Sequence, residues 1–166
     1  MDRIDTTQAD LLASLRDHLR NELGLPPNRC YCTDAPDHLP AAPRGGEYTV
    51  TLAAGDSQFF PGEQSAVQCT EDQSILVTAF ARNAADRVDE LDRMLLDTSR
   101  GLATIKRELL RAVVGRDLPI HGAPFLRQLL FVRRSTRPRL VEHATPGAVL
   151  GTFALEIVAR FDWDLQ

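Results

Sequence analysis

"GTFALEIVARFDWDL", residues 151–165, carries the clearest structural pattern in this chain. Every second residue from Phe153 to Trp163 is apolar, and the residues between them include Thr152, Glu156 and Arg160. Strict alternation of this kind is typical of a β-strand with one face in the core and one in water. We therefore predict a long, half-buried antiparallel strand here.

"SILVTAFAR", residues 74–82, predicts a strand of a different kind. Ile75 and Val77 fall on one face, while Leu76 and Phe80 fall on the other. A strand that is apolar on both faces is typical of the centre of a sheet.

The apolar period changes after this strand. From Asn83 to Gly115, apolar residues recur every three or four positions, which predicts an amphipathic helix capped by Asn83. The sequence "TSRG" at 98–101 can break this helix, so we expect either one long helix or two pieces, the second capped by Ser99.

An earlier helix is predicted near the N-terminus, because leucines recur every four residues from Leu11 to Leu23. Gly24 is positioned to end that helix in a left-handed conformation. Residues 26–46 hold five prolines and predict an extended connector.

The remaining segments favour strands and turns. "EYTVTLAAG", residues 47–55, alternates like a strand, whereas "DSQFFPGEQ", residues 56–64, is rich in turn-forming residues and predicts a loop. Strand pattern resumes around 65–69 and again at 125–134. Pro138 restricts the segment after it to an edge strand or a turn.

These elements predict an α+β fold, with a mixed, largely antiparallel sheet packed against an N-terminal helix and a long or broken central helix. Residues 1–166 are expected to form a single domain. The predicted core comprises Leu15, Leu19, Ile75, Val77, Leu91, Leu95, Phe153, Leu155, Ile157 and Phe161.

Composition is that of an ordinary globular protein, with 43% hydrophobic and 25% charged residues. A net charge of −4 gives no general reason to expect binding to nucleic acid or membranes. The chain contains no apolar run of 18 residues and no signal-peptide pattern, so we expect a cytosolic protein.

The three cysteines do not form a familiar framework. Cys30, Cys32, His38 and Cys69 are possible zinc ligands, but the one-residue gap in "CYC" is not that of zinc ribbons or fingers. No family signature for a nucleophile surrounds any cysteine. We expect free thiols, no metal and no cofactor.

Carboxylates gather in the predicted central helix at Asp86, Asp89, Glu90 and Asp92. Such a run is usually a solvated helix face, although paired acids can also perform acid–base chemistry. No phosphate-binding or nucleophile-elbow motif occurs in the chain, and we expect no enzymatic activity.

Two other groups of residues are candidates for partner contacts. Phe59 and Phe60 are adjacent in a predicted loop, and bulky apolar side chains on a loop indicate a partner surface unless the loop folds back over the sheet. The second group is a basic run that can lie in water or meet an acidic partner or DNA phosphate. It consists of Arg133, Arg134, Arg137 and Arg139.

The whole layout resembles the tail terminator, or tail-completion, proteins of long-tailed bacteriophages and related contractile particles. The resemblance lies in the order of an N-terminal helix, a proline-bearing connector and a strand ending in "TLAAGD". A polar loop then leads to "ILVTAFARNAADRVDELDRMLLD", a second helix, an arginine-rich hairpin and the alternating terminal strand.

This resemblance implies a structural role without catalytic residues. Tail terminators form a hexameric ring that caps the tail tube, stops its polymerisation and offers a docking surface to the head-side connector. It implies a virion protein assembled in the host cytoplasm, whose partners are its own copies, the tube protein, the connector and DNA passing through the lumen. In such a ring we expect the two phenylalanines and the acidic run to form a subunit or tube interface: Phe59, Phe60, Asp86, Asp89, Glu90 and Asp92. The basic run would meet the acidic run of a neighbouring subunit or line the lumen. A head–tail connector or neck protein is the nearest alternative, and a small ligand-binding or enzymatic domain is another.

Overall fold

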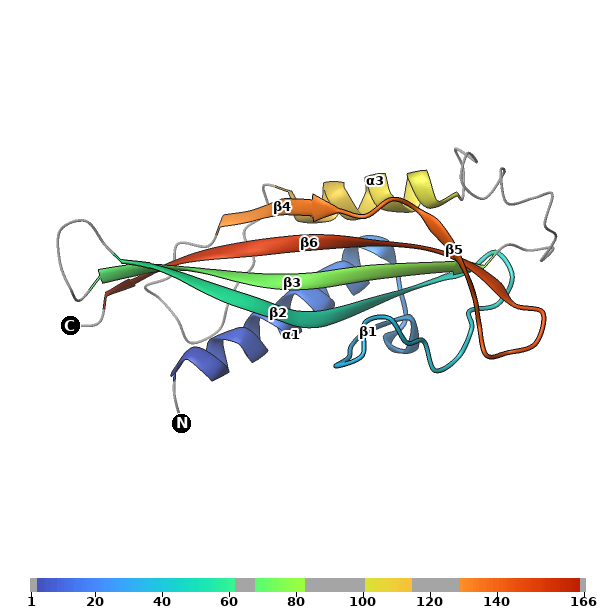
Figure 1. The fold of residues 1–166 in the computed structure, drawn as a ribbon, viewed down its shortest axis with the longest axis horizontal. Coiled ribbons are helices and arrows are strands. Elements are labelled where there is room, and N and C mark those ends of the chain that lie inside the picture. The colour runs from blue at the N-terminus through green and yellow to red at the C-terminus, as the bar shows by residue number, and fades with distance from the viewer. Residues whose placement is uncertain (1–2, 62–67, 83–100, 115–128, 165–166) are drawn as a thin grey trace.

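The computed structural model describes residues 3–61, 68–82, 101–114 and 129–164. In these residues the chain forms a mixed six-stranded sheet and two α-helices (Figure 1). The predicted α+β class and the largely antiparallel sheet are therefore confirmed.

The sheet has the order β1-β2-β3-β6-β4. Its strands are β1 (Cys30–Cys32), β2 (Tyr48–Pro61), β3 (Gln68–Arg82), β4 (Leu129–Ser135), β5 (Arg139–Glu142) and β6 (Val149–Asp164). Among the strands in the described ranges, the β1–β2 pair alone is parallel. β4 and β5 pair with successive parts of β6, and the short β5 after Pro138 confirms the predicted edge position.

Long central strands give the molecule its extended shape. β3 and β6 pair without interruption from Gln68 opposite Asp164 to Arg82 opposite Leu150. Fifteen residues at about 3.4 Å each span roughly 50 Å. The strand predicted at 74–82 thus forms one end of the longer strand β3. The long strand predicted from the alternation at 151–165 is confirmed as β6.

The loop predicted at 56–64 is wrong for residues 56–61, because β2 continues to Pro61. Its pairing with β3 shifts between Ala54 and Ser57, so Gly55 and Asp56 form a β-bulge instead of a turn. The Ser74 hydroxyl donates to the Asp56 carbonyl at 2.9 Å, and a Cβ at Gly55 would collide with Ser74. The nearest clash would be with the Ser74 hydroxyl, and the Ser74 carbonyl oxygen lies 3.0 Å from the same point, so a side chain at position 55 would force Ser74 to shift.

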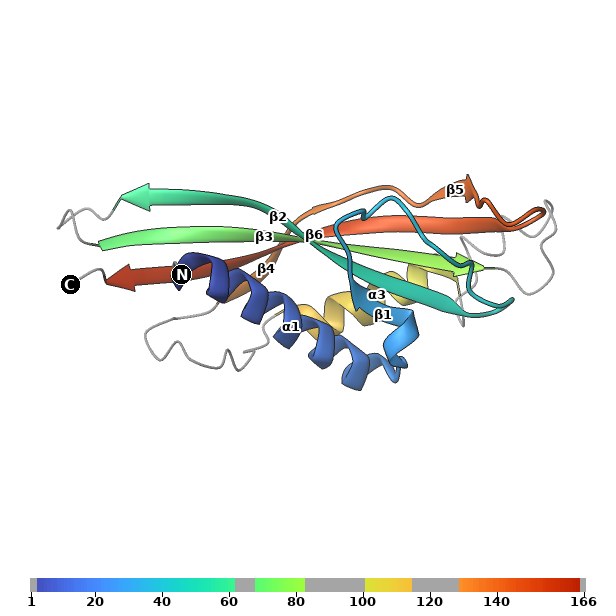
Figure 2. The same ribbon diagram turned by 90° about the horizontal axis from the view of Figure 1, so that it is seen from below.

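Both helices cover one face of the sheet (Figure 2). α1 (Arg3–Leu23) ends as predicted at Gly24, with φ of 64°, and the Leu25 N–H donates to the Arg20 carbonyl at 3.0 Å. α3 (Leu102–Val113) is capped by Gly101 without a side-chain bond. A long central helix is not supported, and the part predicted from Asn83 lies outside the described residues, as does Ser99.

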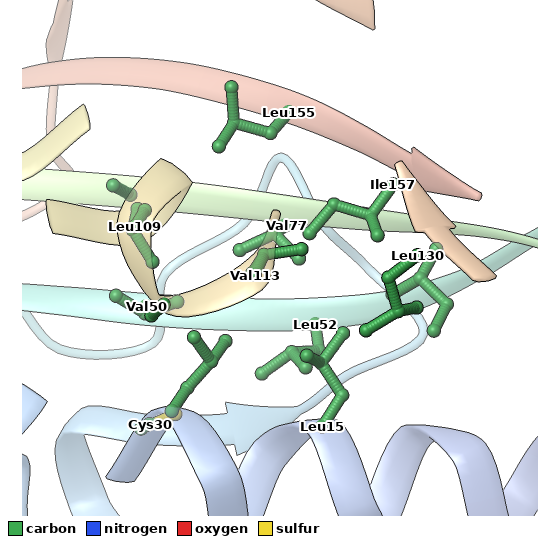
Figure 3. Close-up of a cluster of buried hydrophobic side chains, with 14 of the residues drawn as sticks. Leu15, Cys30, Val50, Leu52, Val77, Leu109, Val113, Leu130, Leu155 and Ile157 are labelled. Atoms are coloured by element: carbon green, nitrogen blue, oxygen red, sulfur yellow. The ribbon is translucent and has the colours of Figure 1, made fainter. Parts of the chain in front are cut away.

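The core lies between the helices and the sheet, where side chains from β2, β3, β4 and β6 meet those of α1 and α3 (Figure 3). Eight predicted core residues are at most 1% exposed, which confirms them: Leu15, Leu19, Ile75, Val77, Phe153, Leu155, Ile157 and Phe161. Leu91 and Leu95 lie outside the described residues.

The connector covers part of the opposite face of the sheet. The connector contains β1 and a 3₁₀ turn, η1 (Pro27–Arg29), and neither element was predicted. It also contributes Leu39 to a second buried cluster with Phe80 and Leu150. A hydrogen bond between His143 Nε2 and the Leu39 carbonyl oxygen, at 2.6 Å, holds this segment against the sheet. We call this side the back face of the sheet.

Candidate functional site

Phe59 and Phe60 lie on a strand at the far end of the sheet. We define the distal arm as Ser57–Pro61 of β2 with Cys69–Gln73 of β3 and the paired end of β6, at the left of Figure 1. Phe59 pairs with Glu71 on the helix-side face and Phe60 with Thr70 on the back face. Their exposed fractions are 48% and 39%, so neither folds back over the sheet.

The outer edge of β2 is open along this arm. β1 pairs with β2 at Val50–Leu52, and one further bond joins the Thr33 N–H to the Leu52 carbonyl at 2.8 Å. Beyond that point, residues 53–61 have no strand partner on this side within the described ranges. Open backbone donors and acceptors are ready templates for a strand of another chain.

A second open edge lies on the other side of the sheet. β4 pairs with β6 alone among the described strands. Because β2–β3, β3–β6 and β6–β4 are all antiparallel, β4 runs opposite to β2. The β4 edge of one copy could therefore continue the β2 edge of another as an antiparallel sheet.

The structure divides the predicted basic run. Arg133 lies 3.3 Å from Glu156 and 3.5 Å from Asp72, so its charge is balanced inside the molecule. Arg139 forms a weak pair with Asp37 at 3.9 Å, where both side chains are largely exposed. Arg134 and Arg137 are exposed and have no ion pair with a described residue. The predicted role of the four arginines at an interface or in a lumen stays a prediction, with Arg133 already paired inside the molecule.

Asp72 is the centre of a charged cluster on the back face. Arg160 donates two hydrogen bonds to its carboxylate, at 2.7 and 2.9 Å, and the guanidinium lies 5.6 Å from the centre of the Phe131 ring. The Asp72 side chain is 3% exposed. The hydrogen bonds from Arg160 hold the pKa of Asp72 below its ordinary value of 3.8, although burial opposes this shift. Asp72 and Glu156 balance the charges of Arg133 and Arg160, so the cluster has no excess positive charge to attract an anion.

The acidic residues predicted for a subunit contact, Asp86, Asp89, Glu90 and Asp92, lie outside the described residues. Their role stays a prediction.

The possible zinc ligands do not converge. The Cys30 and Cys32 thiols approach the α1 carbonyls of Arg16 and Leu12, at 3.7 and 3.9 Å. His38 lies on the back face of the sheet, away from these thiols. Burial raises the pKa of Cys30 to about 11. The parts of the chain that the structure describes contain no group of three metal-ligating side chains.

A pocket of about 400 Å³ opens on the back face between the connector and β5. Its floor comes from β3 and β6 and includes Leu76, Phe80 and Leu150. Asp37, Arg139 and Glu142 also line it, and all three are exposed. A cavity of this size can hold a small organic molecule.

Two buried hydroxyls accompany the pocket. Thr78 lines it and Thr51 is its cross-strand partner on β2; they are 4% and 0% exposed. Neither Oγ1 atom has a hydrogen-bond partner among the residues that the structure describes. Most buried polar groups in folded proteins are hydrogen-bonded, so two neighbouring exceptions are unusual.

No protein-family model matches this chain, and no curated protein matches it in sequence. Among the described helices, none is long and apolar enough to cross a membrane. Functional assignment therefore depends on the residues and their geometry.

Sequence patterns missed the Asp72 cluster and the pocket. Asp72 and Arg160 are 88 residues apart in the chain. Their contact follows from the register of β3 with β6, which alternation alone does not specify.

Proposed function

We propose that the protein is a structural virion component that caps a bacteriophage tail tube, ends its polymerisation and forms the joint to the head connector. The proposal begins from the order of elements along the chain. It assigns no catalytic residue, metal or cofactor.

The observation that best supports it is the pair of open, oppositely directed sheet edges, of which the β2 edge carries two exposed phenylalanines. A ring requires each subunit to present two different, complementary surfaces. Pairing β2 of one copy with β4 of the next meets this requirement and continues the sheet around the ring. Main-chain hydrogen bonds would direct the contact, while Phe59 and Phe60 would supply apolar area.

The basic residues have a revised role in this arrangement. Arg133 is committed to Glu156 and Asp72, so Arg134 and Arg137 are the arginines available to a neighbour or to DNA in the lumen. Exposed ion pairs contribute about 0–1 kcal/mol each, and they would orient subunits more than hold them. The proposed number of six subunits in the ring comes from the resemblance to tail terminator proteins.

The direct test is binding to tail tubes purified from the particle that the protein serves. Wild-type protein should co-sediment with tubes, and electron micrographs should show it at one end. Gln58→Lys places a charge on the open β2 edge and should abolish binding. Ala9→Lys, on the exposed side of α1, adds the same charge away from the edges and should bind normally.

Reversing the charge of Arg134 and Arg137 separates two roles for these residues. Loss of rings would place the arginines between subunits, whereas intact rings with impaired DNA passage would place them in the lumen. A wild-type protein that stays monomeric and does not co-sediment with tubes would refute the proposal.

A head–tail connector position in the same particle would use the same edges. A connector would bind the head instead of the end of the tail tube. The same sedimentation experiment with purified heads therefore distinguishes a connector from a tube cap.

A further inference from the structure

We infer that β4 of a second copy of this chain pairs with the open edge of β2 in one particular register. In this register, residues 54–60 of one copy face Leu129–Ser135 of the other. The inference rests on the edge-to-edge contact of the proposed function and adds the residues that meet there. It assumes neither a number of subunits nor the presence of a tail tube.

The main-chain groups that point out of the sheet can be located on the β2 edge. The Thr33 N–H donates to the Leu52 carbonyl, so the main chain of Leu52 points away from β3. Outward positions recur at every second residue of a regular strand, but the β-bulge of β2 inserts one more residue. The outward positions along the open edge are therefore Ala54, Ser57 and Phe59.

A row of paired residues across the sheet locates the outward positions on β4. The row consists of Ala54, Ile75, Ile157 and Val132. A residue in an antiparallel sheet directs its N–H and C=O to one neighbouring strand only, so bonded and non-bonded pairs alternate along the row. Ala54 and Val132, at the two ends, therefore both turn their main chains away from the sheet.

β4 contains a β-bulge of its own. Its pairing with β6 shifts between Val132 and Arg134, so Arg133 is an extra residue at this point. Outward positions on β4 are therefore three residues apart across the bulge and two apart before it. They are Leu130, Val132 and Ser135.

The two edges match in one register. Because β4 of a neighbour would run antiparallel to β2, its outward positions are met in reverse order, and their spacing then equals that on β2. The two bulges lie opposite each other, and all seven residues of β4 are paired. A shift by two residues would set each bulge against regular strand and interrupt the ladder. The hydrogen-bonded pairs are Ala54 with Ser135, Ser57 with Val132, and Phe59 with Leu130.

Apolar side chains of the two edges meet in this register. Phe59 faces Leu130 on the helix side of the sheet, where Leu130 belongs to the core. On the back face, Gln58 lies opposite Phe131, and Phe60 is the diagonal neighbour of the same ring. Pro61 is the next outward position of β2 and has no N–H, so it would end the ladder.

Opposite charges meet at the two bulges. Asp56 is exposed and has no ion pair with a described residue, and the same is true of Arg134. The register places Asp56 opposite Arg133 and beside Arg134. Arg133 is already shared between Glu156 and Asp72, so Arg134 is the side chain available to the Asp56 carboxylate. The charges therefore favour the same register as the main chain.

Disulfide trapping tests the register. Gln58 and Phe131 would form a non-hydrogen-bonded pair with Cα atoms about 4.5 Å apart, which suits a disulfide. Every variant carries Cys32→Ser and Cys69→Ser, and Cys30 remains because it is buried. Gln58→Cys combined with Phe131→Cys should form disulfides between copies in concentrated solution. The product should be a ladder of dimers and longer chains, because each copy offers two different edges.

Two controls exclude other pairings. Phe60→Cys with Phe131→Cys would be opposite each other only after a shift by two residues, and about tenfold less product is expected because diagonal Cα atoms are too far apart. Gln58→Cys alone should stay monomeric. A disulfide-linked dimer of that single variant would mean that β2 pairs with β2, which overturns the inference.

Charge reversal tests the contact between the bulges. Asp56→Arg should lower the yield of the Gln58–Phe131 cross-link about tenfold, because it sets like charges together. Adding Arg134→Asp should restore most of the yield. Glu22→Arg, on the exposed side of α1, is the matched control and should leave the yield unchanged.

The outcomes separate this inference from the proposed function. Equal yields from the predicted and shifted cysteine pairs, or no cross-link with either, would overturn the register. Cross-linking in the predicted register by a protein that does not bind tail tubes would support the register and refute the tube cap. Tube binding without this cross-link on the bound protein would refute the register alone.

Discussion

Replacing Asp72 by asparagine should destabilise the protein measurably at neutral pH. Asp72 is nearly buried and accepts two short hydrogen bonds from Arg160, with Arg133 3.5 Å away. Asparagine has almost the same size, but it removes the negative charge and turns an amide NH₂ toward one of the donors.

The magnitude follows from these contacts. Hydrogen bonds to charged groups contribute about 1.5–3 kcal/mol, but Arg160 and Arg133 are 45% and 39% exposed and can regain hydration. We therefore expect a loss of about 1–2 kcal/mol in the free energy of unfolding. In urea titration this appears as a lower midpoint with an unchanged slope.

The pH dependence provides an independent check. The pKa of Asp72 is lower in the folded protein than its ordinary value of 3.8, so its contribution is present above that value and is lost as pH falls through the folded pKa. The difference between wild-type and Asp72→Asn proteins should therefore be full at pH 7 and shrink below about pH 3.8.

Asp37→Asn is the matched control. The Asp37 carboxylate is 88% exposed and 3.9 Å from Arg139, so this change should alter stability by less than about 0.5 kcal/mol. If Asp72→Asn behaves like this control at pH 7, the cluster does not stabilise the fold and the reasoning fails.

Three further changes test separate features of the structure. Gly55→Ala should lower the free energy of unfolding, measured by urea titration, by about 1–3 kcal/mol, because its Cβ would collide with Ser74. An unchanged free energy of unfolding would contradict the close contact at the bulge. Thr51→Val should raise the unfolding midpoint, because it replaces a buried hydroxyl without a partner; a lower midpoint would reveal a hidden hydrogen bond. Iodoacetamide at pH 8 should spare Cys30 in the native protein, since burial raises its pKa to about 11; mass spectrometry would show rapid modification if that environment were wrong.

Local periodicity predicted the elements that depend on one segment alone. The alternation of residues 153–161 predicted a buried face of β6, and the leucine repeat predicted a buried face of α1; both faces are buried in the structure. Gly24 likewise ended α1 as its sequence context indicated.

Features that depend on two distant segments were not predictable in this way. Gly55 and Asp56 have the composition of a turn, but β3 was available as a partner and made them a bulge. β1 is only three residues long and lies among prolines, so it has no period of its own. The charge of Arg133 seemed available because its acidic partners belong to β3 and β6.

The proposed cap is tested most directly by the growth of tail tubes from purified tube protein. Added in an amount equal to six copies per growing end, the wild-type protein should stop elongation, while Gln58→Lys should let it continue. Tubes that lengthen at the same rate with and without the wild-type protein would contradict the proposed function.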